Sequence, residues 1–217
     1  MKIKHIFLLL ALVMLGLAAF AQSPNDINLS LSRDKNNISY IDLYSGNIVF
    51  SVSQKGNVRV STLNRSRRVY EDSFTNSGKL IALDDIRLDY YDNFNSHYAG
   101  KLKSVGNIAI AYNDQFDGFD NRGRVKSIGD TKITYTDRFD GLDNRGKIKA
   151  IGSIKVSYYD RFDGAELNGK IKSIGNTVIK YSDRFDGDKA GRIKSITGKT
   201  PNVTINNLLN DDTNEDY

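Results

Sequence analysis

Acidic side chains recur in short loops of the C-terminal half and are the residues best suited to chemistry. The segment 137–144 reads Asp-Arg-Phe-Asp-Gly-Leu-Asp-Asn, which places three carboxylates and one amide within eight residues. Calcium prefers about six to eight oxygen ligands, so repeated acidic turns could bind it. The spacing matches no EF-hand loop, and the alternative is that Asp-Gly forms a tight turn whose acids are solvated. The candidate calcium ligands are Asp117, Asp120, Asp140, Asp143, Asp163, Glu166, Asp186 and Asp188.

A further carboxylate recurs inside the pattern Tyr-x-Asp-x-Phe. If a strand runs through this pattern, alternation places the Asp on the same face as the aromatic residues. Burial of an unpaired carboxylate is costly, so we expect each Asp to pair with a lysine on the neighbouring strand, where opposite charges favour the correct register. The aspartates are Asp114, Asp137, Asp160 and Asp183, and the lysines are Lys103, Lys126, Lys149, Lys172 and Lys194.

Tyrosines and phenylalanines form two more periodic rows. Each aromatic side chain buries about 150–250 Å² when it enters a core, and both rows share the apolar parity of the strand. We therefore expect both rows to be core residues. The alternative is an exposed aromatic ladder that stacks on the sugars of a glycan. The rows are Tyr112, Tyr135, Tyr158 and Tyr181, and Phe116, Phe139, Phe162 and Phe185.

Groups for catalysis are few. Beyond residue 21 the chain has one histidine, His97, and no cysteine. A Ser-His-Asp or Cys-His arrangement would depend on His97 alone, and a zinc site built from histidines is excluded. Carboxylate pairs for glycoside hydrolysis remain available, but identical copies of one acid do not supply the two different environments that a general acid and a base require. We therefore predict that the protein is not an enzyme and has no cofactor other than possible calcium.

A repeat of 23 residues positions all these side chains. Gly100, Gly123, Gly146 and Gly169 open four units, and Gly191 opens a truncated fifth. A fixed period of this kind indicates one supersecondary unit stacked on copies of itself. The predicted domain organisation has divergent β-hairpin units over 38–99, which would act as an N-terminal cap, and the tandem repeats over 100–205.

Two strands fit within one unit. In the third copy, residues 154–162 alternate between apolar and polar side chains, which predicts a strand. In the run 146–151, Ile148 and Ile151 are three residues apart, so either a bulge intervenes or Ile151 belongs to the following turn. The predicted fold class is all-β: tandem β-hairpin repeats in an antiparallel meander that forms a curled sheet, a barrel or a solenoid-like stack. Its apolar face must be covered.

Both ends of the chain differ from the repeats. Residues 1–21 combine two lysines, an apolar run and Ala19-Phe20-Ala21, which predicts a signal peptide cleaved before Gln22. The apolar run is shorter than the ~20 residues of a membrane span, so we expect no transmembrane span after cleavage. Residues 22–37 are predicted to be a flexible segment and residues 206–217 an acidic disordered tail. The protein is expected to be exported to the periplasm or out of the cell.

Charge argues against nucleic acid as a partner. Loss of Lys2 and Lys4 with the signal peptide lowers the formal net charge from +5 to +3. Acidic and basic residues alternate along the repeats, whereas a nucleic-acid-binding protein shows a clustered basic face.

The repeat layout resembles MORN repeats, and most of all the variant in antitoxin-like MORN proteins. These carry paired tyrosines on a strand, an Asn-Gly-Lys turn and then Leu-Lys-Ser-x-Gly. Here Tyr158-Tyr159-Asp160 precedes the segment 168–175, Asn-Gly-Lys-Ile-Lys-Ser-Ile-Gly. The likeness covers at most residues 100–197, and the Phe-Asp-Gly segment is longer than in that family. The repeats are also similar to those of uncharacterised exported proteins of Gram-negative bacteria. The resemblance implies a β-hairpin interaction scaffold and no catalytic residue.

These observations predict an exported, non-enzymatic β-repeat protein that acts as a binding or structural scaffold. The alternative is a calcium-stabilised adhesive or glycan-binding repeat protein, and the second alternative is a carboxylate-dependent exported hydrolase. The partner would be a protein, a component of the cell envelope or a glycan. Open edge strands could also pair with a second copy to form oligomers.

Overall fold

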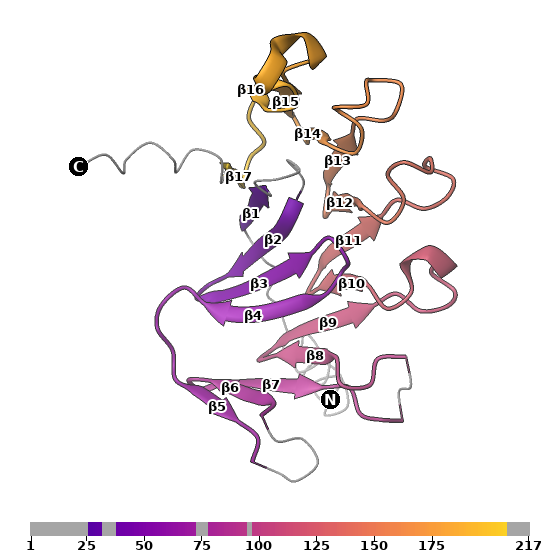
Figure 1. The fold of residues 1–217 in the computed structure, drawn as a ribbon. Coiled ribbons are helices and arrows are strands. Elements are labelled where there is room, and N and C mark those ends of the chain that lie inside the picture. The colour runs from indigo at the N-terminus through magenta and orange to yellow at the C-terminus, as the bar shows by residue number, and fades with distance from the viewer. Residues whose placement is uncertain (1–25, 32–37, 73–77, 95–96, 208–217) are drawn as a thin grey trace, which may run out of the picture.

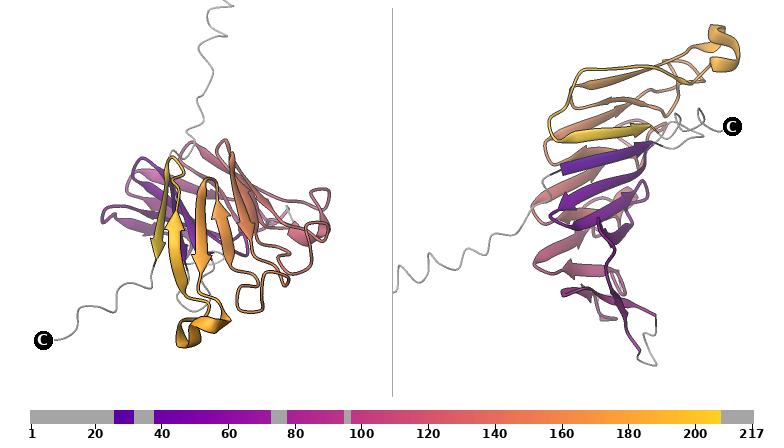
Figure 2. Two further views of the ribbon diagram at one scale, coloured as in Figure 1. Left: turned by 90° about the horizontal axis from the view of Figure 1, so that it is seen from above. Right: turned by 90° about the vertical axis from the view of Figure 1, so that its left-hand side faces the viewer.

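The computed structural model describes residues 26–31, 38–72, 78–94 and 97–207 (Figure 1). The predicted signal peptide and residues 208–217 of the predicted tail lie outside this part of the chain, whereas residues 206–207 of that tail belong to the last strand, Val203–Asn207. The described residues form two β-sheets that pack face to face, as the right-hand view of Figure 2 shows. Among them, no helix is long and apolar enough to cross a membrane.

The longer sheet contains twelve antiparallel strands in chain order, which confirms the predicted all-β meander. It is open, with β5 and β16 at its two edges. Its strands are β5 (Arg68–Tyr70), β6 (Leu80–Leu83), β7 (Ile86–Tyr90), β8 (Leu102–Val105), β9 (Ile108–Tyr112), β10 (Val125–Ile128), β11 (Thr131–Tyr135), β12 (Ile148–Ile151), β13 (Ile154–Tyr158), β14 (Ile171–Ile174), β15 (Thr177–Tyr181) and β16 (Ile193–Thr197).

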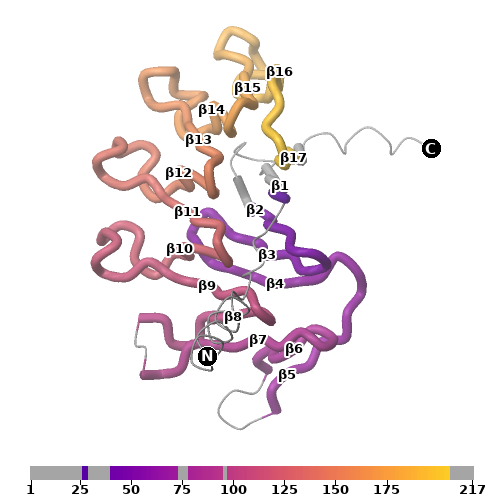
Figure 3. The backbone as a smooth tube through the Cα atoms, turned by 180° about the vertical axis from the view of Figure 1, so that it is seen from behind, coloured from indigo at the N-terminus to yellow at the C-terminus, as the bar shows by residue number. Residues whose placement is uncertain are grey.

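The shorter sheet has five strands in the order β17-β1-β2-β3-β4. The pair β1–β17 is parallel, whereas the other neighbours are antiparallel. This pairing places β17, near the C-terminal end, directly beside β1 (Figure 3). The strands are β1 (Asp26–Leu31), β2 (Ile38–Ser45), β3 (Ile48–Ser53), β4 (Val58–Thr62) and β17 (Val203–Asn207).

Two parts of the predicted domain organisation differ in the structure. The segment 22–37 was predicted to be flexible, yet residues 26–31 form β1 because β2 and β17 pair with both of its edges. Residues 38–99, predicted as one N-terminal cap, contribute to both sheets: β2, β3 and β4 belong to the shorter sheet, and β5, β6 and β7 begin the longer one.

Each unit contributes one strand with a bulge. Tyr135 pairs with Ile148 while Thr134 pairs with Ala150, so Lys149 is the extra residue. The bulge lets both Ile148 and Ile151 reach the core, where each is fully buried. Of the two alternatives that the sequence left open, the bulge is therefore confirmed, and Ile151 belongs to β12.

One hydrophobic core lies between the sheets. The longer sheet contributes inward-facing rows of isoleucine and valine, and the shorter sheet covers them with Ile41, Leu43, Phe50 and Val52, all fully buried. The turn between β3 and β4 fixes this cover, because the Gly56 carbonyl accepts a hydrogen bond from the Val125 N–H at 3.0 Å. The apolar face of the repeats is thus covered by a second sheet of the same chain.

Candidate functional site

The longer sheet carries its irregular connections along one side. Each unit ends its second strand at a tyrosine and reaches the next strand through a connection of about ten residues, and these connections project on the right of Figure 1. We call them the long loops; they span residues 91–101, 113–124, 136–147, 159–170 and 182–192. Two contain short 3₁₀ helices, η1 (Phe119–Asn121) and η2 (Arg184–Lys189).

Every long loop exposes a phenylalanine at the equivalent position of the repeat. The exposed fractions are 98% for Phe94, 86% for Phe116, 90% for Phe139, 90% for Phe162 and 81% for Phe185. We call these five residues the phenylalanine row. The expectation that the phenylalanines lie in the core is wrong, because each strand ends at its tyrosine and the alternation does not continue to the phenylalanine.

The tyrosines, in contrast, belong to the core as expected. Tyr112, Tyr135 and Tyr181 are buried, and Tyr158 is half-buried with its hydroxyl donating to the Ile148 carbonyl at 2.8 Å. A basic side chain covers each of these rings, as Lys147 does at 4.9 Å from the centre of the Tyr158 ring. Each of these long loops therefore begins directly after a tyrosine that packs in the core.

Lys147 also connects consecutive units, because its ammonium donates to the Gly169 carbonyl of the next loop at 2.6 Å. Burial lowers the pKa of Lys147 to about 8. Equivalent bonds run from Lys101 to Gly123, from Arg124 to Gly146 and from Lys170 to Gly191.

Two carboxylates fix the backbone beside Phe116, Phe139, Phe162 and Phe185, and Asp92 Oδ1 accepts the equivalent bond from the Phe94 N–H at 3.1 Å. In the third loop, Asp137 Oδ1 accepts a hydrogen bond from the Phe139 N–H at 2.8 Å, and Asp140 Oδ2 accepts one from the Asp137 N–H at 3.1 Å. The loops of Phe116, Phe162 and Phe185 repeat both bonds. This pattern is an Asx-type turn, which holds the chain in one conformation without a strand partner.

The predicted partners of the lysines require a correction. Lys149 binds Asp140 at 2.5 Å rather than Asp137, because Asp137 lies beyond the end of β11 and caps the turn. Lys126, Lys172 and Lys194 likewise bind the later aspartate of their loops, Asp117, Asp163 and Asp186. The lysines therefore pair with acids of the long loops, and not with acids on a neighbouring strand as predicted.

A third acid ties the second, third and fourth long loops to the loop that follows each of them. Asp120 accepts a hydrogen bond from the Arg138 N–H at 3.2 Å and also forms an ion pair with Arg145. Asp143 binds the backbone and the guanidinium of Arg161 at 3.2 and 2.9 Å. Glu166 accepts from the Arg184 N–H at 3.2 Å. The loops that carry the phenylalanine row are thus joined into one continuous structure.

These contacts also lower the pKa values of the loop carboxylates. Hydrogen bonds from Lys126, Arg145, Lys149 and Arg161 hold the pKa of Asp117, Asp120, Asp140 and Asp143 below the usual range, and the Asp160 N–H does the same for Asp163. We call these five residues the loop aspartates: Asp117, Asp120, Asp140, Asp143 and Asp163.

The eight candidate calcium ligands lie in successive loops. Seven of them accept bonds from the backbone or from basic side chains, as described above, and Asp188 lies exposed in η2. Within the described ranges, no three side chains of the His, Cys, Asp and Glu types gather into a group that could hold a metal ion. The arrangement can stiffen the loops without a cation.

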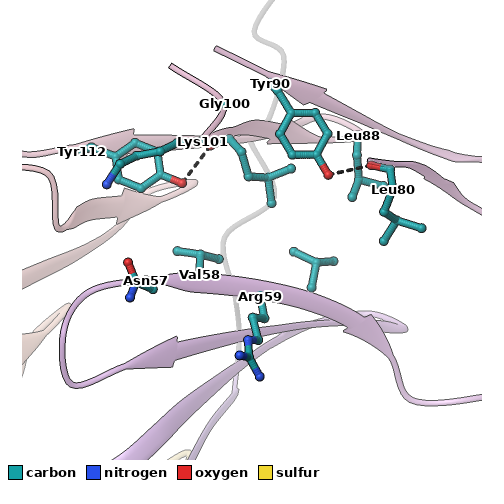
Figure 4. A pocket seen from close by; sticks show the side chains of 11 residues that line it. Asn57, Val58, Arg59, Leu80, Leu88, Tyr90, Gly100, Lys101 and Tyr112 are labelled. Carbon is teal, nitrogen blue, oxygen red and sulfur yellow. Dashed lines mark hydrogen bonds between the residues drawn. The ribbon is translucent and has the colours of Figure 1, made fainter. Parts of the chain in front are cut away.

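A separate cavity of about 410 Å³ opens between β4 and the strands β6 to β9 (Figure 4). Val58 and Val60 form one wall, and Tyr90 and Tyr112 lie opposite. Both tyrosine hydroxyls are satisfied by backbone carbonyls, at 2.6 and 2.9 Å. None of the described residues that line the cavity is a carboxylate, a histidine or a serine, and its titratable side chains are Arg59, Lys101 and the two tyrosines. His97 lies away from it, exposed in the first long loop.

Comparisons with protein-family models, with curated proteins and with solved structures found no match to this chain. The sequence pattern favoured a core position for the phenylalanine row over an exposed ladder, because the strands were expected to continue past their tyrosines. The pattern Asp-x-Phe after a tyrosine could have indicated that the phenylalanines are exposed. Asp commonly accepts a hydrogen bond from the N–H two residues later and so begins a turn.

Proposed function

We propose that the protein is an exported, non-enzymatic binding scaffold whose ligand, a component of the cell envelope, contacts the phenylalanine row. The observation that carries this proposal is that five phenylalanines are 81–98% exposed in one ordered row. Single exposed apolar residues are ordinary, whereas apolar groups gathered on one surface mark interaction sites. Phe119 and Leu142, exposed at 78% and 69%, extend the same surface.

The rigidity of the loops supports a binding role. Side chains on a flexible loop lose conformational entropy when they bind, and preorganisation reduces that cost. Asx-type turns and the links between loops hold the row in place before any ligand arrives. Export follows from the predicted signal peptide, residues 1–21. Equivalent carboxylates repeated from loop to loop do not supply the two different environments that an acid and a base require, which argues for binding without turnover.

Co-sedimentation of residues 22–217 with envelope preparations tests this function. The probes are purified peptidoglycan sacculi and outer-membrane vesicles of a Gram-negative bacterium. One variant changes Phe116, Phe139 and Phe162 to serine, and the matched control changes three exposed lysines on the longer sheet, Lys132, Lys155 and Lys180, to serine.

We expect the chain to sediment with one of these probes, the phenylalanine variant to lose binding and the lysine variant to retain it. Both variants should keep the melting temperature of the parent chain. Failure to sediment with either probe would overturn the proposal, and so would undiminished binding by the phenylalanine variant.

A further inference from the structure

The spacing of the phenylalanine row is set by the sheet. Each unit contributes two strands to the longer sheet, and neighbouring strands lie about 4.7–4.9 Å apart. Successive repeat units are therefore roughly 9–10 Å apart along the sheet. This interval is comparable to the length of one disaccharide in an extended β-1,4-linked polysaccharide. In such a chain alternate sugars present the same face, so one ring can meet one equivalent sugar face per disaccharide.

The groups beside each ring suit a neutral polyhydroxylated ligand. The apolar C–H face of a pyranose stacks on an aromatic ring, and hydroxyls at its edge need polar partners. Arg138 and Arg161 precede Phe139 and Phe162, and their side chains are 54% and 55% exposed. The segment 160–172 carries three acidic and three basic residues, so its formal charge is zero. A nucleic acid would require a strongly basic surface instead.

The twist of the sheet separates a polymer from a membrane. Neighbouring strands of a sheet rotate by roughly 20–25°, and the long loops accordingly fan out when the molecule is viewed from above (Figure 2, left). A flat lipid surface could contact only part of such a row. A linear polymer whose glycosidic linkages each rotate slightly can twist along the row from Phe94 to Phe185 while it stays extended, and so reach every ring.

We propose that the phenylalanine row binds an extended β-1,4-linked polysaccharide, with one disaccharide per repeat unit. This inference rests on the proposed function and specifies its ligand. The number of rings engaged then increases with the length of the glycan. Binding strength should rise with each added disaccharide until the row is filled, because every further ring is engaged within the same complex.

Isothermal titration of residues 22–217 with chitobiose, chitotetraose and chitohexaose tests the inference. We expect the affinity to rise by up to about tenfold for each added disaccharide, the upper end of what one aromatic contact contributes. The variant with serine at positions 116, 139 and 162 should lose most of the gain in affinity from chitobiose to chitohexaose. The lysine control variant should keep it. Maltohexaose, whose α-1,4 linkages curve the chain, should bind at least tenfold more weakly than chitohexaose.

Equal affinities for the three chito-oligosaccharides, or for chitohexaose and maltohexaose, would overturn the inference, as would no binding of chitohexaose. The outcome also separates the two proposals. If chitohexaose does not bind but the chain still sediments with an envelope preparation through its phenylalanines, only the ligand class is wrong. If the phenylalanines matter in neither assay, the proposed function fails as well.

Discussion

Replacing Phe50 by alanine should destabilise the protein strongly, whereas the same change at Phe139 should leave its stability almost unchanged. Phe50 is fully buried between the two sheets, and Phe139 is 90% exposed on its loop. Truncation of a buried phenylalanine to alanine costs about 3–5 kcal/mol, which combines lost transfer free energy and a cavity. A surface substitution without special contacts changes the free energy of unfolding by only about 0.5 kcal/mol in either direction.

Urea unfolding followed by circular dichroism measures both values on the same scale. For a chain of this size, each kcal/mol corresponds to about 2–4 °C of melting temperature, so Phe50→Ala should lower the melting temperature by roughly 6–20 °C. A cost for Phe139→Ala as large as that for Phe50→Ala would show that the loop ring is packed, and would refute the assignment of the phenylalanine row as a surface. A cost below about 1 kcal/mol for Phe50→Ala would refute the shared core.

Three further expectations concern the support of that surface. Tyr112→Phe should lower the free energy of unfolding by about 1 kcal/mol, because it removes the hydrogen bond to the Leu102 carbonyl. Tyr135→Phe should be nearly neutral in the same urea assay, since its buried hydroxyl has no hydrogen-bond partner. Equal costs for the two variants would contradict this expectation. Gly56→Ala should destabilise the protein more than Gly46→Ala. Both residues have positive φ, but only at position 56 would the new Cβ lie 2.5 Å from Arg124 Cβ. Equal melting temperatures of the two variants would count against the docking of the β3–β4 turn. The loop aspartates have lowered pKa values in the folded state. Their contribution to the free energy of unfolding is therefore present above pH ~4 and is lost as the pH falls below it. A urea midpoint that stays constant from pH 6 to pH 3 would contradict this.

Calcium provides one more test of the same loops. Because seven of the eight candidate ligands already accept hydrogen bonds or ion pairs within the protein, we expect thermal melts with excess calcium and with a chelator to superimpose. A ligand at a hundredfold over its dissociation constant would stabilise the fold by about 2.7 kcal/mol per site. A rise of several degrees that the chelator reverses would show that the loops bind the cation after all.

The repeat and its strands could be predicted from the sequence because their signals are local. Alternation over a few residues predicts a strand, and the recurrence of Gly123 and Gly146 at one interval predicts stacked units. The cover of the core could not be predicted in the same way. The strand β1 (Asp26–Leu31) pairs with β17 (Val203–Asn207), and no local pattern links segments so far apart in the chain.

The loop site was predicted in part. The sequence identified the acidic residues and the lysines that pair with acids, but it paired these lysines with the row of aspartates that includes Asp137, whereas Lys149 binds Asp140. The reason is geometric: the bulge at Lys149 and the end of β11 at Tyr135 shift the facing residues. The same strand end turns Phe139 from an expected core residue into an exposed one. A misplaced strand boundary of a few residues was therefore enough to hide the surface on which the function is proposed to depend.

A graded series of variants tests the central claim most directly. Serine is introduced at one, three and then five positions of the phenylalanine row, and binding of each variant to the preparation that the parent chain binds is measured by co-sedimentation. Contact along the whole row predicts an affinity that falls stepwise with the number of rings removed, at an unchanged melting temperature. An affinity that does not change across the series, or that is lost entirely at one position and is indifferent to the other four, would contradict the account.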